Sequence, residues 1–385
     1  FSNEYETRRA LADFLMRAPK LSMDEQCFAF EAEFARKQQA NHCILFNSGG
    51  SANLALLQSL RNIGRVKAGA TIGFSALTWS TNVMPIIQMG FKAVPIDCDP
   101  TTLNVMSSGI KAALGARDID VLFLTNVLGF AGDLPEIKAM CDERGIVLLE
   151  DNCEALGSRF QCGLTGSFGL GASFSFFVAH HMSTIEGGCI CTNDSELAEM
   201  LVIVRANGWD RNLSAEQQAK WRGRYGIKSE FEAKYTFYDL AFNFRPTEIT
   251  GFLGQQQLQY LDANNQRRFE NHLLLEQVVA SNPDLIPIRR DHMEQPSPFA
   301  FPVVCKTPQL RDHYLQQFSG AGVEVRPMIA GNIARQPFYR IYDSSSHDLP
   351  GAEMLHECGF YSGNYPELTS RDLSTLASCV TRRFR

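Results

Sequence analysis

The histidine at position 180 is the first candidate for a catalytic side chain in this sequence. It lies in a segment of small and aromatic residues that reads Ser-Phe-Phe-Val-Ala-His-His-Met-Ser-Thr-Ile-Glu-Gly-Gly over positions 175–188. An imidazole ring gains and loses a proton near neutral pH, so His180 is suited to general acid–base catalysis. Its neighbour His181 is assigned no role, because a histidine taken singly is more often structural than catalytic.

A second chemical signal is the turn Asn-Ser-Gly-Gly-Ser-Ala-Asn over positions 47–53. It stands between a predicted strand and a predicted helix. A turn of small residues at a helix start presents free backbone N–H groups and the positive end of the helix dipole, which suits a phosphate group. Taken alone the motif is weak, because Gly- and Ser-rich turns between a strand and a helix are more often turns without a ligand.

The side chains of Trp79 and Asp151 each have a property that favours ligand binding. Trp79, in Thr-Trp-Ser-Thr, offers a flat aromatic face that suits a flat, electron-poor ring. Asp151 ends the apolar run Leu-Leu-Glu-Asp, where a buried carboxylate is costly unless it has a partner. Both have an ordinary alternative: Trp79 as a partly buried structural residue and Asp151 as a helix N-cap.

The elements that must position these residues alternate between short β-branched runs and helical patterns. Continuous apolar strands separated by helices predict an α/β protein with a mainly parallel sheet covered on both faces. The predicted strands are 43–46, 71–74, 93–97, 121–126, 146–150 and 173–178, and the predicted helices between them are 51–62, 80–89 and 134–143.

The second half of the chain has a different pattern. Residues 207–240 are polar and aromatic, and we interpret them as a long excursion near the active site. A long amphipathic helix is predicted over 247–280, with a break near Asn264. We expect a large α/β domain over residues 1–245 and a smaller α+β domain over 246–385. The other elements predicted here are a helix over 196–206 and strands over 299–305 and 323–326.

The composition indicates a globular protein without a nucleic-acid or membrane partner. At 385 residues, 45% of them hydrophobic, the chain can bury a substantial core. The net charge of −6, with scattered Lys and Arg, gives no basic surface for nucleic acid. No stretch approaches the roughly 18 apolar residues that span a bilayer. The first residues are acidic and polar, unlike a signal peptide, so we expect a cytoplasmic location.

The eleven cysteines are an odd number and stand mostly in apolar runs. This pattern predicts reduced, buried thiols rather than a disulfide framework. Cys189 and Cys191 are the only close pair. Their spacing allows them to bind a metal, but we interpret them as two residues on the same face of a strand.

Taken together, the motifs resemble those of the DegT/DnrJ/EryC1/StrS family, whose members use pyridoxal 5'-phosphate (PLP) to act on nucleotide-linked keto sugars. The resemblance covers nearly the whole chain and is strongest over 43–260. It implies the aspartate aminotransferase (type I PLP) fold, with a mostly parallel seven-stranded sheet between helices. It also implies that Gly50, Ser51 and Ser175 hold the cofactor phosphate.

The same resemblance implies roles for four further residues. Trp79 would stack on the pyridine ring, and Asp151 would pair with the protonated ring nitrogen, which keeps the ring an electron sink. Glu154 stands near the cofactor's 3-hydroxyl, where aminotransferases of the family usually carry Gln. Asn243, in Asn-Phe-Arg, would reach the cofactor phosphate of the neighbouring subunit, which implies a homodimer with shared active sites.

At position 180 the sequence departs from the family's aminotransferases, which carry there the lysine that binds PLP covalently. Imidazole cannot replace that bond, and a histidine here resembles the sugar 3-dehydratases of the family. One kind of 3-dehydratase uses an iron–sulfur cluster, but no cysteine lies between Cys191 and Cys305 to supply its group of three. The kind without a cluster is the closer match, and Cys153 is interpreted as a buried thiol.

The implied reaction removes the C3 hydroxyl of a nucleotide-linked 4-keto-6-deoxy sugar, with GDP-4-keto-6-deoxy-D-mannose as the expected substrate. L-Glutamate would convert PLP to pyridoxamine 5'-phosphate (PMP), His180 would move the proton, and ammonia would be released. Two alternatives stay open: an aminotransferase that tolerates His180, and a non-catalytic PLP-fold sensor or scaffold. No residue that contacts the nucleotide base can be named from the sequence.

Overall fold

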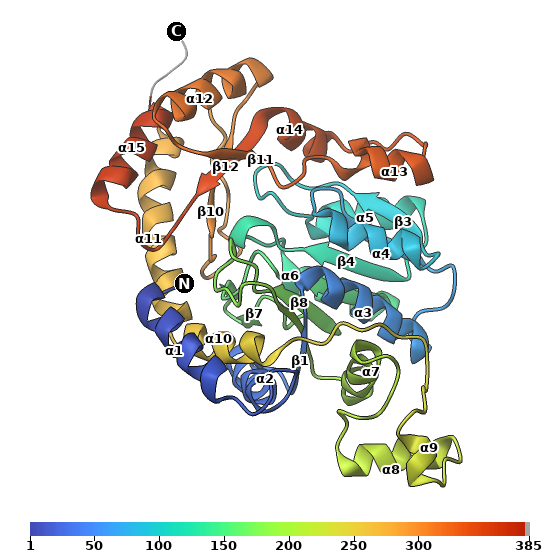
Figure 1. The fold of residues 1–385 in the computed structure, drawn as a ribbon. Helices are drawn as coiled ribbons and strands as arrows, with labels where there is room; N and C mark the ends of the chain where they lie inside the picture. Colours follow the sequence, from blue (N-terminus) through green and yellow to red (C-terminus); the bar gives the residue numbers. More distant parts are fainter. Residues whose placement is uncertain (382–385) are drawn as a thin grey trace.

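A seven-stranded sheet forms the centre of the protein, as the computed structural model of residues 1–381 shows (Figure 1). Its strands are β1 His42–Phe46, β2 Thr71–Ser75, β3 Lys92–Ile96, β4 Val121–Thr125, β5 Val147–Asp151, β8 Gly171–Ser175 and β9 Gly188–Thr192. The strand order is β1-β9-β8-β5-β4-β2-β3, and β9 alone runs antiparallel to its neighbours. The predicted mostly parallel seven-stranded sheet is therefore confirmed.

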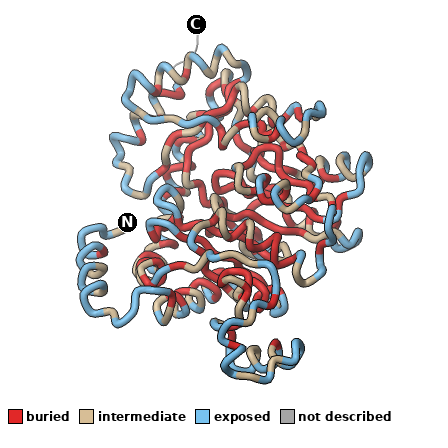
Figure 2. The backbone as a smooth tube through the Cα atoms, turned by 45° about the vertical axis from the view of Figure 1, so that its right-hand side comes forward, coloured by how far each residue is buried: buried red, intermediate tan, exposed pale blue. Residues whose placement is uncertain are grey.

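Helices cover both faces of this sheet, because its strands carry apolar side chains on both sides. The covering helices are α2 Glu25–Gln38, α3 Gly49–Asn62, α4 Ser80–Gln88, α5 Ser107–Ala116, α6 Leu134–Arg144 and α7 Ser195–Arg205. On one face α3, α4 and α7 pack against residues such as Phe46 and Phe74. On the other face α2 covers β1, β9 and β8, while α5 and α6 cover the strands from β5 to β3. Figure 2 shows the resulting buried interior.

Two more helices complete the N-terminal side of the molecule, α1 Glu4–Arg17 and α10 Glu248–Leu258. Helix α10 packs against α2, and its buried Glu248 carboxylate accepts hydrogen bonds from the N–H groups of Asp24 and Cys27 at the start of α2. A carboxylate at this place satisfies N–H groups that have no partner inside the helix. Helix α1 stacks Phe14 on Phe252 of α10 at 4.5 Å between ring centroids.

The C-terminal part forms a smaller α+β unit around a three-stranded antiparallel sheet of order β10-β12-β11. Its core packs apolar residues of α11, α12 and α15 against that sheet. Its elements are α11 Leu261–Ala280, β10 Ala300–Val304, α12 Pro308–Gly320, β11 Val325–Pro327, η2 Ile333–Arg335, α13 Pro337–Tyr342, α14 Pro350–Cys358, β12 Gly359–Gly363 and α15 Ser370–Thr381. The domain border at residues 245–246 stays a prediction.

The break in the predicted long helix lies earlier than expected. Helix α10 ends at Leu258 and α11 begins at Leu261, whereas the sequence placed the break near Asn264. The reason is tertiary: Leu261 is buried under α2, and Asn265 donates to the backbone carbonyl of Leu156, so both residues are fixed within α11.

The excursion over 207–240 is a projecting arm rather than a wall of the cavity at His180. It carries α8 Ala215–Arg224 and α9 Glu230–Ala233, which lie outside the main body at the lower edge of Figures 1 and 2. A capping box formed by Ser214 and Gln217 starts α8. The remaining short elements are η1 Val127–Gly129, β6 Arg159–Phe160 and β7 Gly163–Leu164.

None of the helices in residues 1–381 combines the length and the apolar character needed to cross a membrane. The cysteines in this part of the chain form no disulfide, and nine of them are buried. Cys162 is exposed and Cys153 is half-buried, so the prediction of buried thiols does not hold for these two.

Candidate active site

A cavity of about 450 Å³ lies where the parallel strands end at their carboxyl sides. Ligands of open α/β sheets bind at this edge, because the loops that follow neighbouring strands meet there. The residues that line it are Ser48, Gly49, Gly50, Trp79, Thr81, Asn82, Thr125, Asp151, Cys153, Glu154, Ser175, Phe177, Ala179, His180, Glu186, Phe299, Ile329 and Tyr361.

Six of the eight site residues predicted from the sequence line this one cavity: Gly50, Trp79, Asp151, Glu154, Ser175 and His180. Ser51 does not line it, because its N–H donates to the Ser48 hydroxyl at 3.0 Å and its own hydroxyl lies 2.8 Å from the same oxygen. Asn243 lines a different cavity. The structure therefore brings together most of the predicted site and leaves Asn243 apart from it.

The predicted phosphate turn joins β1 to α3. Ser48 caps the helix by accepting the Ser51 N–H, and the preceding N–H groups of the first turn have no intrahelical partner. Strand β9 passes close beneath this turn: a Cβ at Gly188 would lie 2.5 Å from the Gly49 nitrogen. Glycine at position 188 therefore lets the strand support the turn without filling it.

Asp151 lies at the end of β5, at the bottom of the cavity. It is buried, and one carboxylate oxygen accepts hydrogen bonds from Asn53 at 2.9 Å and from Asn82 at 2.8 Å. The other oxygen accepts the Cys153 N–H at 2.9 Å. These donors are all neutral, and no helix starts here, so the N-cap alternative fails. A buried carboxylate held only by neutral donors is suited to a cationic ligand group.

Trp79 stands at the mouth of the cavity, immediately before α4. Trp79 is 54% exposed. A large aromatic side chain left this open beside a cavity can stack on a flat ligand. The neighbouring Thr78 is fully buried and shares a hydrogen bond of 2.6 Å with Thr125, which fixes the backbone before Trp79.

His180 lies on the loop between β8 and β9, between two aromatic rings. The ring centroids of Phe177 and Phe299 lie 6.0 and 5.8 Å from that of the imidazole. Burial lowers the pKa of His180 to about 4, although the Asp151 carboxylate opposes this effect. Its Nδ1 atom is buried without a hydrogen-bond partner in residues 1–381. At neutral pH the imidazole is therefore uncharged and able to accept a proton.

The next residue, His181, is structural, as expected. Its Nε2 lies 2.7 Å from the carbonyl oxygen of Ser297, and its own carbonyl accepts a hydrogen bond from the buried guanidinium of Arg268 at 3.1 Å. Arg268 also donates to the carbonyl of Asn364. The backbone that carries His180 is thus anchored to the C-terminal unit by Arg268.

Glu154 lies next to Asp151 in the cavity wall. Burial, together with the Asp151 charge, raises the pKa of Glu154 to about 8, and a hydrogen bond of 3.0 Å from the Leu128 N–H limits the rise. Leu128 has a left-handed backbone (φ 54°) that directs this N–H at the carboxyl group. Most Glu154 side chains are protonated at neutral pH, so this carboxyl group can donate a hydrogen bond.

Sequence reasoning missed several residues of the site. Asn82, Phe299 and Tyr361 line the cavity, and Arg268 fixes the loop of His180. Phe299, Tyr361 and Arg268 come from the C-terminal unit, far along the chain from the motifs, so no local pattern indicates them. Asn53 was part of the quoted turn, but its contact with Asp151 depends on the position of β5 relative to α3.

A second cavity of about 470 Å³ adjoins the first one and shares Ala179, Phe299 and Tyr361 with it. It lies against the small sheet and the start of α15, and it contains the cation Arg326, which pairs with Glu324. The two cavities together are long enough for a ligand larger than a single ring.

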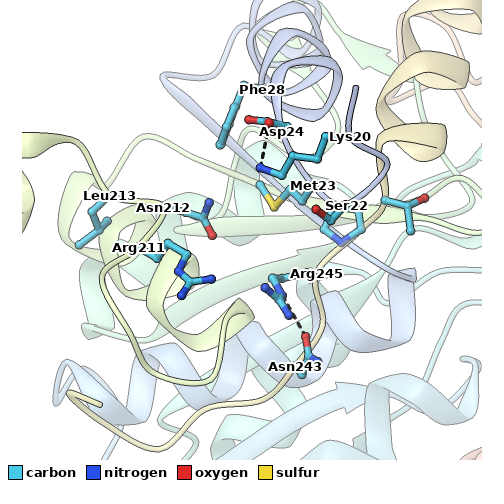
Figure 3. Close-up of a pocket in the computed structure, with 12 residues that line it drawn as sticks. Lys20, Ser22, Met23, Asp24, Phe28, Arg211, Asn212, Leu213, Asn243 and Arg245 are labelled. Carbon is cyan, nitrogen blue, oxygen red and sulfur yellow. Dashed lines mark hydrogen bonds and ion pairs between the residues drawn. The ribbon is translucent and has the colours of Figure 1, made fainter. Parts of the chain in front are cut away.

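A third cavity, of about 620 Å³, lies elsewhere and contains Asn243 (Figure 3). Asn243 accepts a hydrogen bond from Arg245 at 3.2 Å, and Arg211 and Lys20 point into the same space. Lys20 also pairs with Asp24 at 2.8 Å. Three cations against one acid make this cavity positively charged.

The chain belongs to the DegT/DnrJ/EryC1/StrS aminotransferase family, whose sequence pattern matches residues 3–381. This confirms the family that the motifs indicated. Among curated relatives, a GDP-4-keto-6-deoxy-D-mannose 3-dehydratase of Escherichia coli O55:H7 is 31% identical over 94% of this chain and 92% of its own length. A dTDP-4-dehydro-2,6-dideoxy-D-glucose 3-dehydratase of Saccharopolyspora spinosa is also 31% identical, over 91% of this chain and 78% of its own.

Among solved structures, GDP-4-keto-6-deoxymannose-3-dehydratase with a trapped PLP-glutamate geminal diamine is similar over the whole fold. The TM-score is 0.88 at 29% identity, and the match covers 97% of both chains. The predicted type I PLP fold is therefore confirmed.

Proposed function

We propose that this protein is a PLP-dependent 3-dehydratase that removes the C3 hydroxyl of a nucleotide-linked 4-keto-6-deoxy sugar. The first candidate substrate is GDP-4-keto-6-deoxy-D-mannose, with L-glutamate as the amino donor. The observation that carries this proposal is that His180 lines one cavity with Asp151, Trp79 and Ser175. The family's aminotransferases place a lysine where this chain has His180.

The residues of the cavity fit PLP. Asp151 is buried and its hydrogen-bond donors are neutral, so its carboxylate can accept a hydrogen bond from a protonated pyridine nitrogen and stabilise that cation. The start of α3 with Gly50, together with Ser175, would hold the phosphate, and Trp79 would cover the ring face. Ser51 would contribute to the phosphate site through the cap that it forms with Ser48.

When bound, PLP and the PMP formed from it by glutamate supply an electron sink for the carbon beside the amine. The chain itself supplies the proton transfer. His180 would accept a proton as an uncharged base, and the proton would then go to the departing C3 hydroxyl from His180 or through a water. The rings of Phe177 and Phe299 limit the access of water to the imidazole. Without a lysine at position 180, nothing recaptures the cofactor, and the nitrogen leaves as ammonia.

The nucleotide would extend into the adjoining cavity. Arg326 offers a cation for its diphosphate, and the aromatic rings of Tyr361 and Tyr365 line the same space. Whether the nucleotide is GDP or dTDP stays open, since the relatives named above are named for both kinds of nucleotide sugar.

The charge of the two main cavities supports a homodimer with shared active sites. Among the described residues that line the His180 cavity, none is Lys or Arg, whereas Asp151, Glu154 and Glu186 are acidic. PLP carries a phosphate and the substrate a diphosphate. The cations of the Asn243 cavity would supply the missing positive charge if a partner subunit placed it over the His180 cavity. We also propose that the protein is located in the cytoplasm.

Product analysis tests the reaction directly. The protein is mixed with PLP, glutamate and GDP-4-keto-6-deoxy-D-mannose, and ammonia and the mass of the sugar product are followed. Ammonia with a sugar that has lost one oxygen and gained no nitrogen supports the 3-dehydratase. A nitrogen-bearing sugar without ammonia would establish an aminotransferase instead. PLP absorbance that does not respond to glutamate would favour a sensor or scaffold.

A further inference from the structure

Three cysteines converge inside the core, on the face of the sheet that α2 covers. Cys43 of β1 is paired directly with Cys191 of β9, and Cys189 lies two residues before Cys191 on the same face. Side chains alternate along a strand, so all three point to one side. Their sulfur atoms lie within 4.8 Å of one another. The sequence showed the Cys189–Cys191 pair only, because Cys43 reaches it through the register of β1 with β9.

The surroundings of these thiols are apolar. All three cysteines are buried, and the same cluster contains aromatic residues such as Phe34 and Phe174. None of the three lines the His180 cavity, and the proposed reaction uses none of them. An apolar shell around a set of sulfur ligands keeps water and harder ligands away from an ion bound between them.

We propose that Cys43, Cys189 and Cys191 bind one Cu(I) ion as three thiolates. Soft thiolate ligands select Cu(I) and Zn(II). Structural zinc is almost always four-coordinate, and among residues 1–381 no fourth His, Cys, Asp or Glu joins this group. An ion about 2.3 Å from each sulfur in a trigonal plane needs sulfur atoms about 4 Å apart. Small side-chain rotations reach this spacing from the present one.

The thiols must lose protons to bind the ion, so Cu(I) affinity should rise with pH. Burial raises the pKa of Cys43 and of Cys189 well above the ordinary thiol value. Burial also opposes ionisation of Cys191, but hydrogen bonds from Cys189 and Cys43 outweigh it and lower the pKa of Cys191.

An ion can approach the group through Cys43. This residue lines a cavity of about 280 Å³ between α2 and α7, together with Glu31 and His42. Asn41, which lines the same cavity, is exposed, so the cavity begins at the protein surface. Cys189 and Cys191 lie behind Cys43, with 0% and 1% of their surface exposed.

Anaerobic Cu(I) titration of the reduced, metal-free protein against a bicinchoninate competitor tests the site. We expect one tightly held Cu(I) per chain, with X-ray absorption showing three sulfur neighbours at about 2.3 Å. Cys191→Ser should weaken binding about 100-fold or more. Cys141→Ser, which removes a buried thiol of α6, should leave binding unchanged.

Two results would overturn the proposal: two sulfur neighbours or nitrogen and oxygen neighbours around copper, or equal affinity in Cys191→Ser and the unmodified protein. If Cys191→Ser fails to fold, as judged by its circular dichroism, the X-ray absorption of the unmodified protein decides alone. A Cys43–Cys191 disulfide in place of copper binding would also count against the site.

Discussion

The cavity around His180 and the cavity around Asn243 have opposite characters. The first is lined by the acids Asp151 and Glu186 and by no Lys or Arg among the described residues, and its buried Asp151 carboxylate is held by neutral donors. The second carries the cations Lys20, Arg211 and Arg245. Proton transfer and electron withdrawal need the first environment, and anion binding needs the second. If active sites are shared between subunits as proposed, one chain supplies the two halves of a site at different places on its surface.

The largest expected effect concerns the His180 cavity alone. His180→Asn removes the base while keeping a side chain of similar size, and we expect a loss of about 10²–10⁴-fold in the rate of dehydration. The PLP absorbance should stay as in the unmodified protein, because Asp151 and the turn at α3 are untouched. His42→Asn, which changes a half-buried histidine bonded to Ser195 away from this cavity, is the control. A rate within threefold of normal for His180→Asn would exclude His180 as the base.

The neutral donors around Asp151 should matter next. Asn53→Ala removes the hydrogen bond to this buried carboxylate and should weaken PLP binding by about 1–3 kcal/mol, or roughly 5- to 100-fold. Asn62→Ala, at the other end of α3, removes an amide that bonds the carbonyl of Leu240 and should leave PLP affinity unchanged. Equal PLP affinity in the two variants, measured by absorbance titration, would mean that Asp151 does not hold the cofactor.

Mixing variants tests whether the two cavities complete each other. Asn243→Ala and His180→Asn should each have low activity, because each damages one half of the site. After subunit exchange, half of the dimers are mixed and each mixed dimer has one intact site, so activity should return to about a quarter of normal. Mixing His180→Asn with Asp151→Asn, which lie in the same cavity, should restore nothing. No recovery in the first mixture would argue against shared sites.

The smallest effect concerns stability rather than activity. The pKa of Glu154 is about 8 in the folded protein and near 4.5 in an unfolded chain. The unfolded state therefore releases this proton first, and the Glu154 contribution to stability falls as pH rises from 4.5 to 8, by at most ~1.4 kcal/mol per pH unit. Glu154→Gln should remove this slope in urea unfolding of the PLP-free protein. The exposed Glu216→Gln should keep it, and an unchanged slope in Glu154→Gln would show Glu154 to be ionised.

Much of the His180 cavity was predictable, because its residues follow strands. Gly50, Asp151 and Ser175 come at or after the ends of β1, β5 and β8, and parallel strands bring such ends to one edge of the sheet. The family resemblance supplied the reaction class, since His180 stands in the lysine position. The names of the relatives agree with that class.

The rest depends on contacts between distant segments. Phe299 and Tyr361 reach the cavity from the C-terminal unit, and Cys43 joins Cys189 and Cys191 only through strand register. The sequence also placed Asn243 in the same site as His180 through a neighbouring subunit. Its position in a separate cavity is consistent with that expectation, but no local pattern could show which surface carries it.

The projecting arm links two residues of the cationic cavity, since Arg211 precedes α8 and Asn243 follows α9. It is held to the body chiefly by Trp221 and Tyr238, and the indole N–H of Trp221 donates to Glu199 of α7 at 3.1 Å. A segment with so little buried support opens at a lower free energy than the sheet. The amide hydrogens of the arm should exchange with deuterium before those of the core, and proteases should cut the chain there first. Such a cut would separate Arg211 from Asn243, while the residues around His180 would stay folded.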